Sequence, residues 1–142
     1  MKTIKPIFLT LCLFVVTCLF VQAKPDHKSV IAREHIISQY IQCTTQGEVG
    51  GISQLLDENF KECMPLKGKT VIYSKEQVVS FLRSTKGLVQ NCTTDYSWVE
   101  SSDKVAIAKV EMKYPDFTRV DYITLNNIGG AWKVTHVAAS YE

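Results

Sequence analysis

Asp121 and His136 form the sharpest chemical pair that the sequence offers. The two glycines at 129–130 favour a two-residue type I′ hairpin turn, which places Ile123 directly opposite His136 on the flanking strands. Asp121 and His136 then become diagonal neighbours on one sheet face, about 7–8 Å apart at the backbone. A carboxylate that orients an imidazole is typical of general acid–base sites, so the pair is a candidate for catalysis or ligand contact. The alternative is a structural pair whose members satisfy one another.

Tyr40 and Trp132 are the other candidate ligand-binding residues. Tyr40 lies at the edge of the apolar face of a predicted helix, where its hydroxyl would donate a hydrogen bond to a ligand. The alternative is a core aromatic residue whose hydroxyl reaches the rim of the core. Trp132 falls on the same predicted sheet face as Asp121, where a core position is the simpler interpretation.

Three cysteines follow the N-terminal segment, Cys43, Cys63 and Cys92. An odd number allows at most one intramolecular disulfide, and the sequence leaves open which two would pair or whether all three are buried thiols. No C-x-x-C or H-x-x-x-H spacing occurs, so we expect no metal site and no cofactor. Nothing next to any of the three in the sequence indicates a cysteine nucleophile.

The N-terminus has the pattern of a secretory signal peptide. A basic start precedes an apolar run over 7–21, and a small residue follows at position 23. We therefore expect a signal peptide over 1–23 and a domain over 24–142 that is exported to a periplasmic or extracellular location and is free of the membrane. A retained anchor is one alternative. Lipidation at Cys18 is another, although Thr17 stands where a lipobox has a small residue.

The charge balance argues against a nucleic-acid partner. Sixteen Lys and Arg against fourteen Asp and Glu give a net charge of +2. Lys2 and Lys5 belong to the predicted signal peptide, so the remaining domain is neutral, whereas nucleic-acid-binding domains are usually strongly basic. A hydrophobic fraction of 46% is ordinary for a globular domain.

The order of predicted elements indicates an α+β fold with three N-terminal helices packed on a curved, mainly antiparallel sheet. Ser74 and Gln77 match a helix capping box. The helices are expected from 26 or 29 to 45, over 49–57 and from 74 to 87. The first is expected to bury the face of Val30, Ile37, Ile41 and Thr44, and the third the face of Val78, Phe81, Leu82 and Thr85. Strands are expected over 60–64, 70–73, 90–100, 104–114, 118–128 and 131–141. The small side chains of Ala106, Ala108 and Ala138 on the predicted inner face favour a hollow there.

The closing strands carry Asp121-Tyr122-Ile123-Thr124-Leu125 and Gly130-Ala131-Trp132-Lys133-Val134. These segments resemble the final hairpin of the "putative lumazine-binding" branch of the NTF2-like (SnoaL-like) superfamily, and the resemblance extends over 28–141. It implies a cone in which a curved sheet encloses a pocket against the helices, commonly as a homodimer through the outer sheet face. It implies no activity, because the same cone hosts isomerases, cyclases, dehydratases and binding domains.

Three functions therefore remain open. The first is binding of an unidentified small molecule in an apolar pocket between helices and sheet. The second is an enzyme of the isomerase, cyclase or dehydratase kind that uses His136 with Asp121. The third is a protein-interaction module, which requires an exposed apolar patch.

Overall fold

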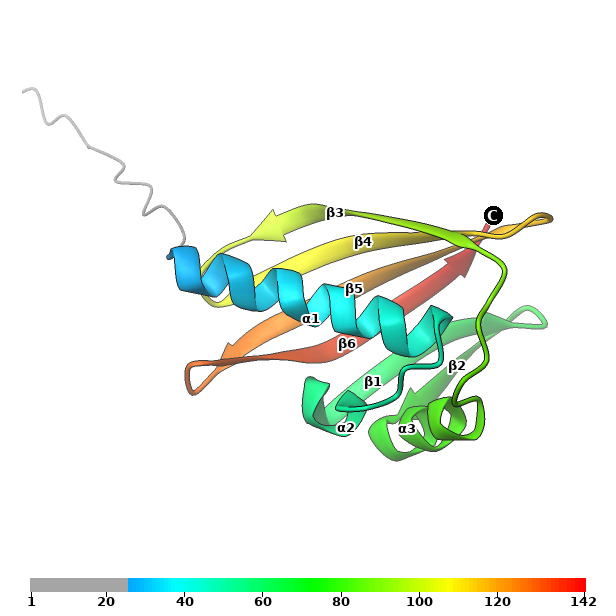
Figure 1. Ribbon diagram of the computed structural model, residues 1–142, viewed down its shortest axis with the longest axis horizontal. Helices are drawn as coiled ribbons and strands as arrows, with labels where there is room; N and C mark the ends of the chain where they lie inside the picture. The colour runs from blue at the N-terminus through cyan, green and yellow to red at the C-terminus, as the bar shows by residue number, and fades with distance from the viewer. Residues whose placement is uncertain (1–25) are drawn as a thin grey trace, which may run out of the picture.

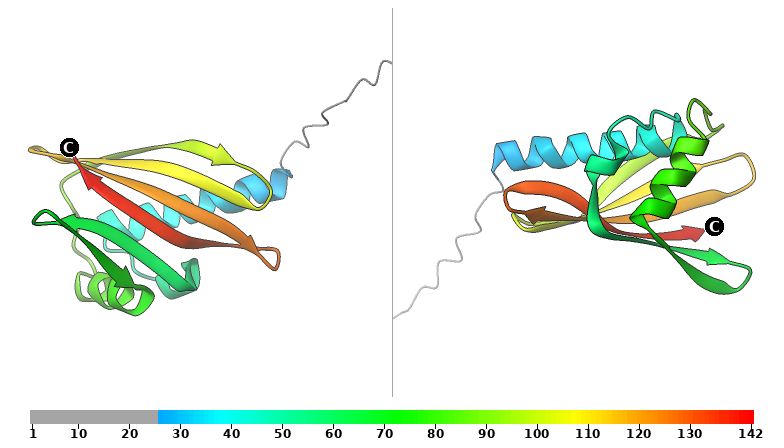
Figure 2. Two further views of the ribbon diagram at one scale, coloured as in Figure 1. Left: turned by 180° about the vertical axis from the view of Figure 1, so that it is seen from behind. Right: turned by 90° about the horizontal axis from the view of Figure 1, so that it is seen from below.

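The computed structural model describes residues 26–142, so the predicted signal peptide over 1–23 lies outside the described residues. Within the described part of the chain, no helix is long and apolar enough to cross a membrane. One sheet forms a layer and the helices lie over one of its faces (Figures 1 and 2). This arrangement confirms the predicted α+β class.

Strands β1 to β6 span Leu56–Leu66, Lys69–Ser74, Thr93–Ser101, Val105–Lys113, Thr118–Ile128 and Ala131–Tyr141. They form a six-stranded sheet in the order β2-β1-β6-β5-β4-β3. Neighbouring strands are antiparallel except β1 and β6, which run parallel. This parallel pair joins the first hairpin to the long C-terminal meander, so residues distant in the sequence meet on one face.

Helix α1 spans His27–Thr45 and helix α3 spans Lys75–Ser84. The predicted capping box of α3 is confirmed, because Ser74 accepts from the Gln77 backbone amide and the Gln77 side chain accepts from the Ser74 amide. Helix α3 follows β1 and β2, in agreement with the predicted order of segments. The prediction of three helices packed on the sheet differs from the structure only in the second helix.

Helix α2, Ile52–Leu55, is a single turn rather than the predicted helix over 49–57. Gly51 precedes it in the left-handed conformation, and Leu56 is already extended. The chain thus passes directly from this turn into β1. Two longer helices and one turn cover the sheet.

Strand β1 continues through Pro65, where the sequence predicted its end. Pro65 pairs with Thr70 on β2, whereas the pairing of β1 with β6 stops at Cys63. A proline lacks the backbone N–H, so it is tolerated where one neighbouring strand is missing.

The buried face of α1 is rotated from the predicted one. The sequence favoured Val30, Ile37, Ile41 and Thr44, which share apolar helical spacing. The side chains that are buried are Arg33, Ile36, Ile37, Tyr40, Cys43 and Thr45. The difference arises because the helix buries a charged residue, Arg33, for which two tryptophans provide the environment described below.

The hairpin of β5 and β6 has the predicted turn but a shifted register beyond it. Leu125 pairs with Val134 as expected, whereas Thr124 and not Ile123 pairs with His136. The extra residue between these pairs is Thr135, a β-bulge that reverses the alternation of faces along the rest of β6. His136 consequently lies on the face without helices, and Val137 lies in the core with no exposed surface.

The inner face of the sheet is a filled core over most of its area. Ala106 and Ala108 are completely buried under α1, so the hollow predicted at these small side chains is not found. Ala138 has moved to the outer face with the bulge. The buried inner-face residues of β4, β5 and β6 are Ala106, Ala108, Val110, Met112, Asp121, Ile123, Leu125, Trp132, Val134 and Val137.

Candidate functional site

A cavity of about 420 Å³ opens between α1, α3 and the sheet, at the end of the sheet where β1 and β2 turn. Its apolar wall consists of Met64 on β1 and Val78 and Leu82 on α3. Aromatic side chains border it at Tyr73, Phe81 and Tyr141. Its polar lining consists of Tyr40, Thr44, Glu62, Gln77, Gln90 and Arg119. The cavity thus combines an apolar wall, aromatic rings and a concentrated polar floor.

Arg119 organises that floor. Its Nε donates to Asp121 Oδ1 at 2.7 Å and its Nη2 donates to Asp121 Oδ2 at 2.9 Å. The same Nη2 donates to Glu62 Oε1 at 2.8 Å. Arg119 and Asp121 are two residues apart on β5 and so share a face, whereas Glu62 lies two strands away on β1. The residue opposite Asp121 on the intervening strand is Ala139, whose small side chain leaves room for the guanidinium.

Tyr40 completes the cluster from α1. Its hydroxyl donates to Asp121 Oδ2 at 2.9 Å, and both residues are buried. Burial, followed by the charge of Asp121, raises the pKa of Tyr40 well above its usual value. The phenol therefore stays protonated, with its hydrogen directed at Asp121 and not into the cavity.

Two carboxylates share one guanidinium, which leaves the cluster with an excess of negative charge when all three groups are ionised. Burial raises the pKa of Glu62, and the nearby charge of Arg119 only partly opposes this. For Arg119, burial disfavours the charged form, but the charges of Asp121 and Glu62 outweigh it and raise its pKa. Arg119 therefore remains a cation, and Glu62 takes up a proton more readily than an exposed glutamate does.

The structure brings Tyr40 and Asp121 together but not Asp121 and His136. The predicted Asp121–His136 pair is wrong in geometry, because the bulge at Thr135 turns the imidazole to the opposite face of the sheet. His136 Nε2 lies 3.4 Å from Cys63 Sγ there. The roles assigned to these residues in catalysis or ligand binding stay predictions.

Trp132 lies away from the cavity, under the first half of α1. Its Nε1 donates to Ser29 Oγ at 3.0 Å, and its ring is 5.1 Å from the guanidinium carbon of Arg33. This agrees with the interpretation of Trp132 as a core residue.

Sequence reasoning missed Glu62 and Arg119 as members of the site. Arg119 was recognisable, since it stands two residues before Asp121 and must share its face. Glu62 had no comparable local signal. It joins the cluster only through the parallel pairing of β1 with β6, which a sequence does not reveal locally.

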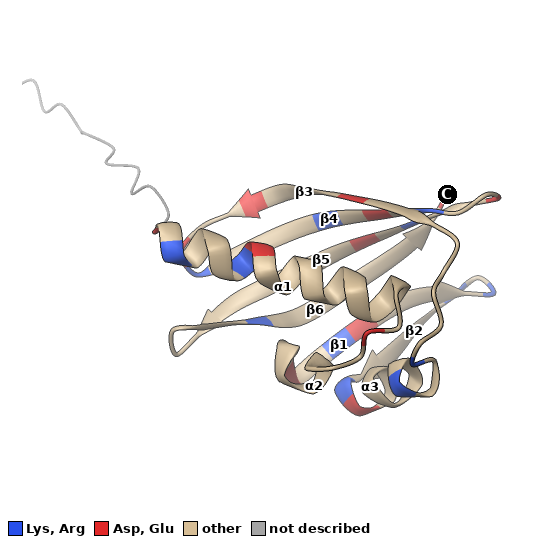
Figure 3. Cartoon of the chain, viewed as in Figure 1, with Lys and Arg blue, Asp and Glu red and all other residues tan. Residues whose placement is uncertain are grey.

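The described residues contain no group of three or more His, Cys, Asp or Glu side chains placed to hold a metal ion. Cys43, Cys63 and Cys92 are all free thiols. Acidic and basic positions are interspersed over the helices and strands (Figure 3).

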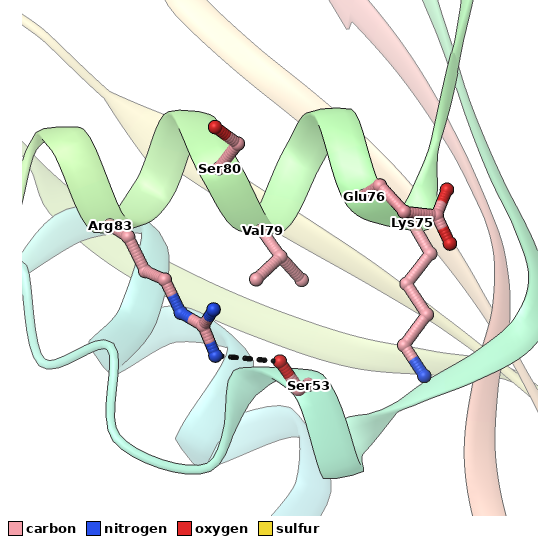
Figure 4. Close-up of a pocket in the computed structure, with 6 residues that line it drawn as sticks. All are labelled: Ser53, Lys75, Glu76, Val79, Ser80 and Arg83. Carbon is pink, nitrogen blue, oxygen red and sulfur yellow. Dashed lines mark hydrogen bonds between the residues drawn. The ribbon is translucent and has the colours of Figure 1, made fainter.

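A second groove, of about 350 Å³, lies between α2 and α3 (Figure 4). Its two cationic side chains are already paired. Arg83 Nη2 donates to Ser53 Oγ at 3.0 Å, and Lys75 Nζ lies 2.6 Å from Glu58 Oε1. These contacts hold α3 against α2 and the start of β1, which is a structural role.

Comparison with known proteins gives one family and one fold. The family model described as "Putative lumazine-binding" matches residues 28–142. A search of curated proteins finds no match.

Solved structures of NTF2-like proteins share the fold at low sequence identity. One, of unknown function from Silicibacter pomeroyi, has a TM-score of 0.69 and 14% identity, covering 81% of this chain and 97% of its own. Another, of unknown function from Methylobacillus flagellatus, has a TM-score of 0.70 and 15% identity, covering 84% and 96%. A "putative ketosteroid isomerase" from Shewanella frigidimarina has a TM-score of 0.59 and 18% identity, covering 77% and 94%.

Proposed function

The chain belongs to the "Putative lumazine-binding" family of NTF2-like proteins, and from this premise we propose that it binds a small planar molecule in the cavity beside Arg119. The observation that carries the proposal is the cluster of half-buried Arg119 with buried Glu62, Asp121 and Tyr40 at the floor of a cavity with apolar and aromatic sides. A few convergent polar groups in an otherwise apolar hollow of this size are typical of small-molecule sites.

The polar floor favours a ligand with N–H donors along one edge. Glu62 Oε1 is occupied by Arg119, whereas Glu62 Oε2 has no hydrogen-bond partner within residues 26–142. Gln77 uses its side-chain oxygen to cap α3, which leaves its NH₂ group for a ligand acceptor. A cyclic amide or imide matches this combination of acceptor and donor.

The sides of the cavity favour a flat ligand. The rings of Tyr73, Phe81 and Tyr141 border the cavity, and Phe81 is well exposed although the sequence placed it on the buried face of its helix. Aromatic faces of this kind stack on planar heterocycles. Lumazine, a bicyclic heterocycle with such amide edges, is the probe that the family description suggests.

The test compares two carboxylates that differ in position. Titration calorimetry with lumazine is expected to show saturable binding by the wild type and a Kd at least about tenfold higher for Glu62→Gln. Glu100→Gln, which removes an exposed carboxylate on β3 outside the cavity lining, serves as the matched control and is expected to keep the wild-type Kd. Equal Kd values for all three proteins would contradict a site at Glu62.

The proposal of a small-molecule function is tested separately by native mass spectrometry of protein purified from its host. A retained small molecule supports it. A spectrum of the bare chain, together with no saturable binding of lumazine, would contradict it.

A second candidate is proton transfer of the isomerase kind, with Glu62 rather than His136 as the base. The raised pKa of Glu62 beside the cavity favours it, as does likeness to a fold neighbour described as a ketosteroid isomerase. Proton exchange at the carbon next to the carbonyl of a cyclic ketone in D₂O, followed by NMR, is then expected in the wild type and lost in Glu62→Gln. No exchange above the buffer rate in the wild type would reject this candidate.

Export and self-association complete the proposal. The apolar run over 7–21 supports export, and fractionation of the host is expected to place the shortened chain outside the cytoplasm. A homodimer is also expected, and light scattering after size exclusion measures the oligomeric state.

A further inference from the structure

The outer face of the sheet carries a thiol next to an imidazole. Cys63 on β1 and His136 on β6 lie on neighbouring parallel strands, with 3.4 Å between Sγ and Nε2. Both side chains are half-buried, and both lie on the face opposite the helices, seen from behind in Figure 2. The pair is thus separate from the cavity, whose floor is formed by Glu62 on the other side of the same strand.

The bulge at Thr135 creates this pair. Without it, His136 would face the core and Cys63 would have Val137 or Thr135 as its outer neighbour. With it, the imidazole stands beside the thiol, next to Lys61, its pairing partner on β1, and Thr124, its partner on β5. Ile72, the partner of Cys63 on β2, is 60% exposed and adds an apolar side to the thiol.

We propose that Cys63 is a nucleophilic thiol assisted by His136 and that its substrate class is peroxides. In this step the imidazole Nε2 takes the thiol proton, and the Sγ electron pair attacks one oxygen of the peroxide. The O–O bond breaks and an S–O bond forms. With hydrogen peroxide, the leaving hydroxide takes the proton back from the imidazolium and departs as water, leaving a sulfenic acid on Cys63.

The surroundings decide what happens to this product. Cys43 lies buried in α1 on the helix-covered side and Cys92 precedes β3 at the far edge of the sheet, so neither is positioned to form an intrachain disulfide with Cys63. Within residues 26–142, therefore, no second thiol lies beside Cys63 to convert the sulfenic acid into an intrachain disulfide, and a chemical trap can capture it.

The test uses the full-length protein treated with hydrogen peroxide, with dimedone as the trap for sulfenic acid. Peptide mass spectrometry then measures the rate of labelling at each cysteine. We expect labelling of Cys63 in the wild type to be at least about tenfold faster than in His136→Gln. Thr124→Val, which alters the other neighbour of the imidazole, is the matched control and is expected to keep the wild-type rate within about twofold.

Labelling of Cys43 and Cys92 in the same samples separates a local effect from loss of the fold. An unfolded variant labels Cys43, Cys63 and Cys92 alike, whereas loss of assistance by His136 slows Cys63 alone. The proposal is overturned if Cys63 in the wild type labels no faster than Cys92, or if His136→Gln leaves the ratio of the Cys63 rate to the Cys92 rate unchanged.

Discussion

The space beneath α1 holds two arginines, the buried Arg33 and the half-buried Arg119, in opposite kinds of environment. Arg119 is bound by the carboxylates of Asp121 and Glu62. Arg33, which is 2% exposed, lies between the rings of Trp98 and Trp132, at 5.7 and 5.1 Å from their centroids. It has no carboxylate partner within residues 26–142, and its Nε has no hydrogen-bond partner there.

The difference separates the Arg33 end of the molecule from the end where we propose the ligand site. Aromatic faces stabilise Arg33 through packing and cation–π attraction. Ion pairs stabilise Arg119 while an adjacent space stays open, which leaves a carboxylate oxygen available to a ligand. Burial of a charge alone therefore does not indicate a site, whereas burial of a charge cluster with an adjoining cavity does.

Of the changes that test this contrast, Arg119→Met is expected to have the largest effect on stability. The change leaves Asp121 and Glu62 buried without their cation, which is expected to lower the free energy of unfolding by about 3–5 kcal/mol. Urea denaturation followed by circular dichroism measures it. A loss below about 1 kcal/mol would show that the carboxylates do not depend on the guanidinium.

Replacing Arg33 with Met is the matched change at the other end. The methionine keeps contact with both tryptophans, and the change removes a buried Nε that has no hydrogen-bond partner. The cation–π contacts and the 2.9 Å hydrogen bond from Arg33 to the Ser102 carbonyl are lost. We therefore expect the free energy of unfolding to fall by a smaller amount, about 1–2 kcal/mol. The same urea titration applies. A loss as large as that of Arg119→Met would remove the distinction between the two ends.

The sequence was sufficient for the class and for the final hairpin, because β-rich segments and paired glycines are local signals. The bounds of β5 and β6 agree with the predicted ranges 118–128 and 131–141. The predicted face of His136 was wrong because one bulge residue, Thr135, reverses the alternation of side chains between the two sheet faces. The apolar spacing from Val134 to Val137, three rather than two, was the available indication of that bulge.

The site was predictable only in part, for a physical reason. Asp121 was identified from strand alternation, and Tyr40 from helical spacing, yet their contact depends on how α1 docks on the sheet. The position of Glu62 in the site depends on a parallel pairing between segments about 75 residues apart. Such long-range packing leaves no local pattern, so the site was incomplete before the fold was known.

Glu34→Gln tests the hydrogen bonds near Arg33, where Glu34 contacts Tyr96 and Trp98. The Glu34 carboxylate accepts from Trp98 Nε1 at 2.8 Å and from the Tyr96 hydroxyl. The hydrogen bond to Glu34 and partial burial raise the pKa of Tyr96 to about 12, so stability from this group is lost as the pH rises from about 10 toward 12.

In Glu34→Gln the pKa of Tyr96 is expected to return toward 10, with a loss of about 1 kcal/mol at neutral pH from the weaker hydrogen bonds. Ultraviolet titration of tyrosine ionisation measures the first effect, with Tyr122→Phe to identify an exposed tyrosine in the curve. An unchanged titration would mean that Glu34 does not hold Tyr96.

The smallest expected effect is the pH dependence that Glu62, at the floor of the cavity, gives to the free energy of unfolding. Because burial raises the pKa of Glu62, the folded protein holds this proton more tightly than the unfolded chain does. Its contribution to stability is fully present below the unfolded pKa of about 4.3 and is lost as the pH rises through the folded pKa. Glu62→Gln cannot titrate, so the free energy of unfolding of the wild type minus that of this variant is expected to decline from pH 4 to pH 7. A difference that instead grows over this range would mean that attraction to Arg119 outweighs burial, and the cavity end would then resemble an ordinary structural ion pair.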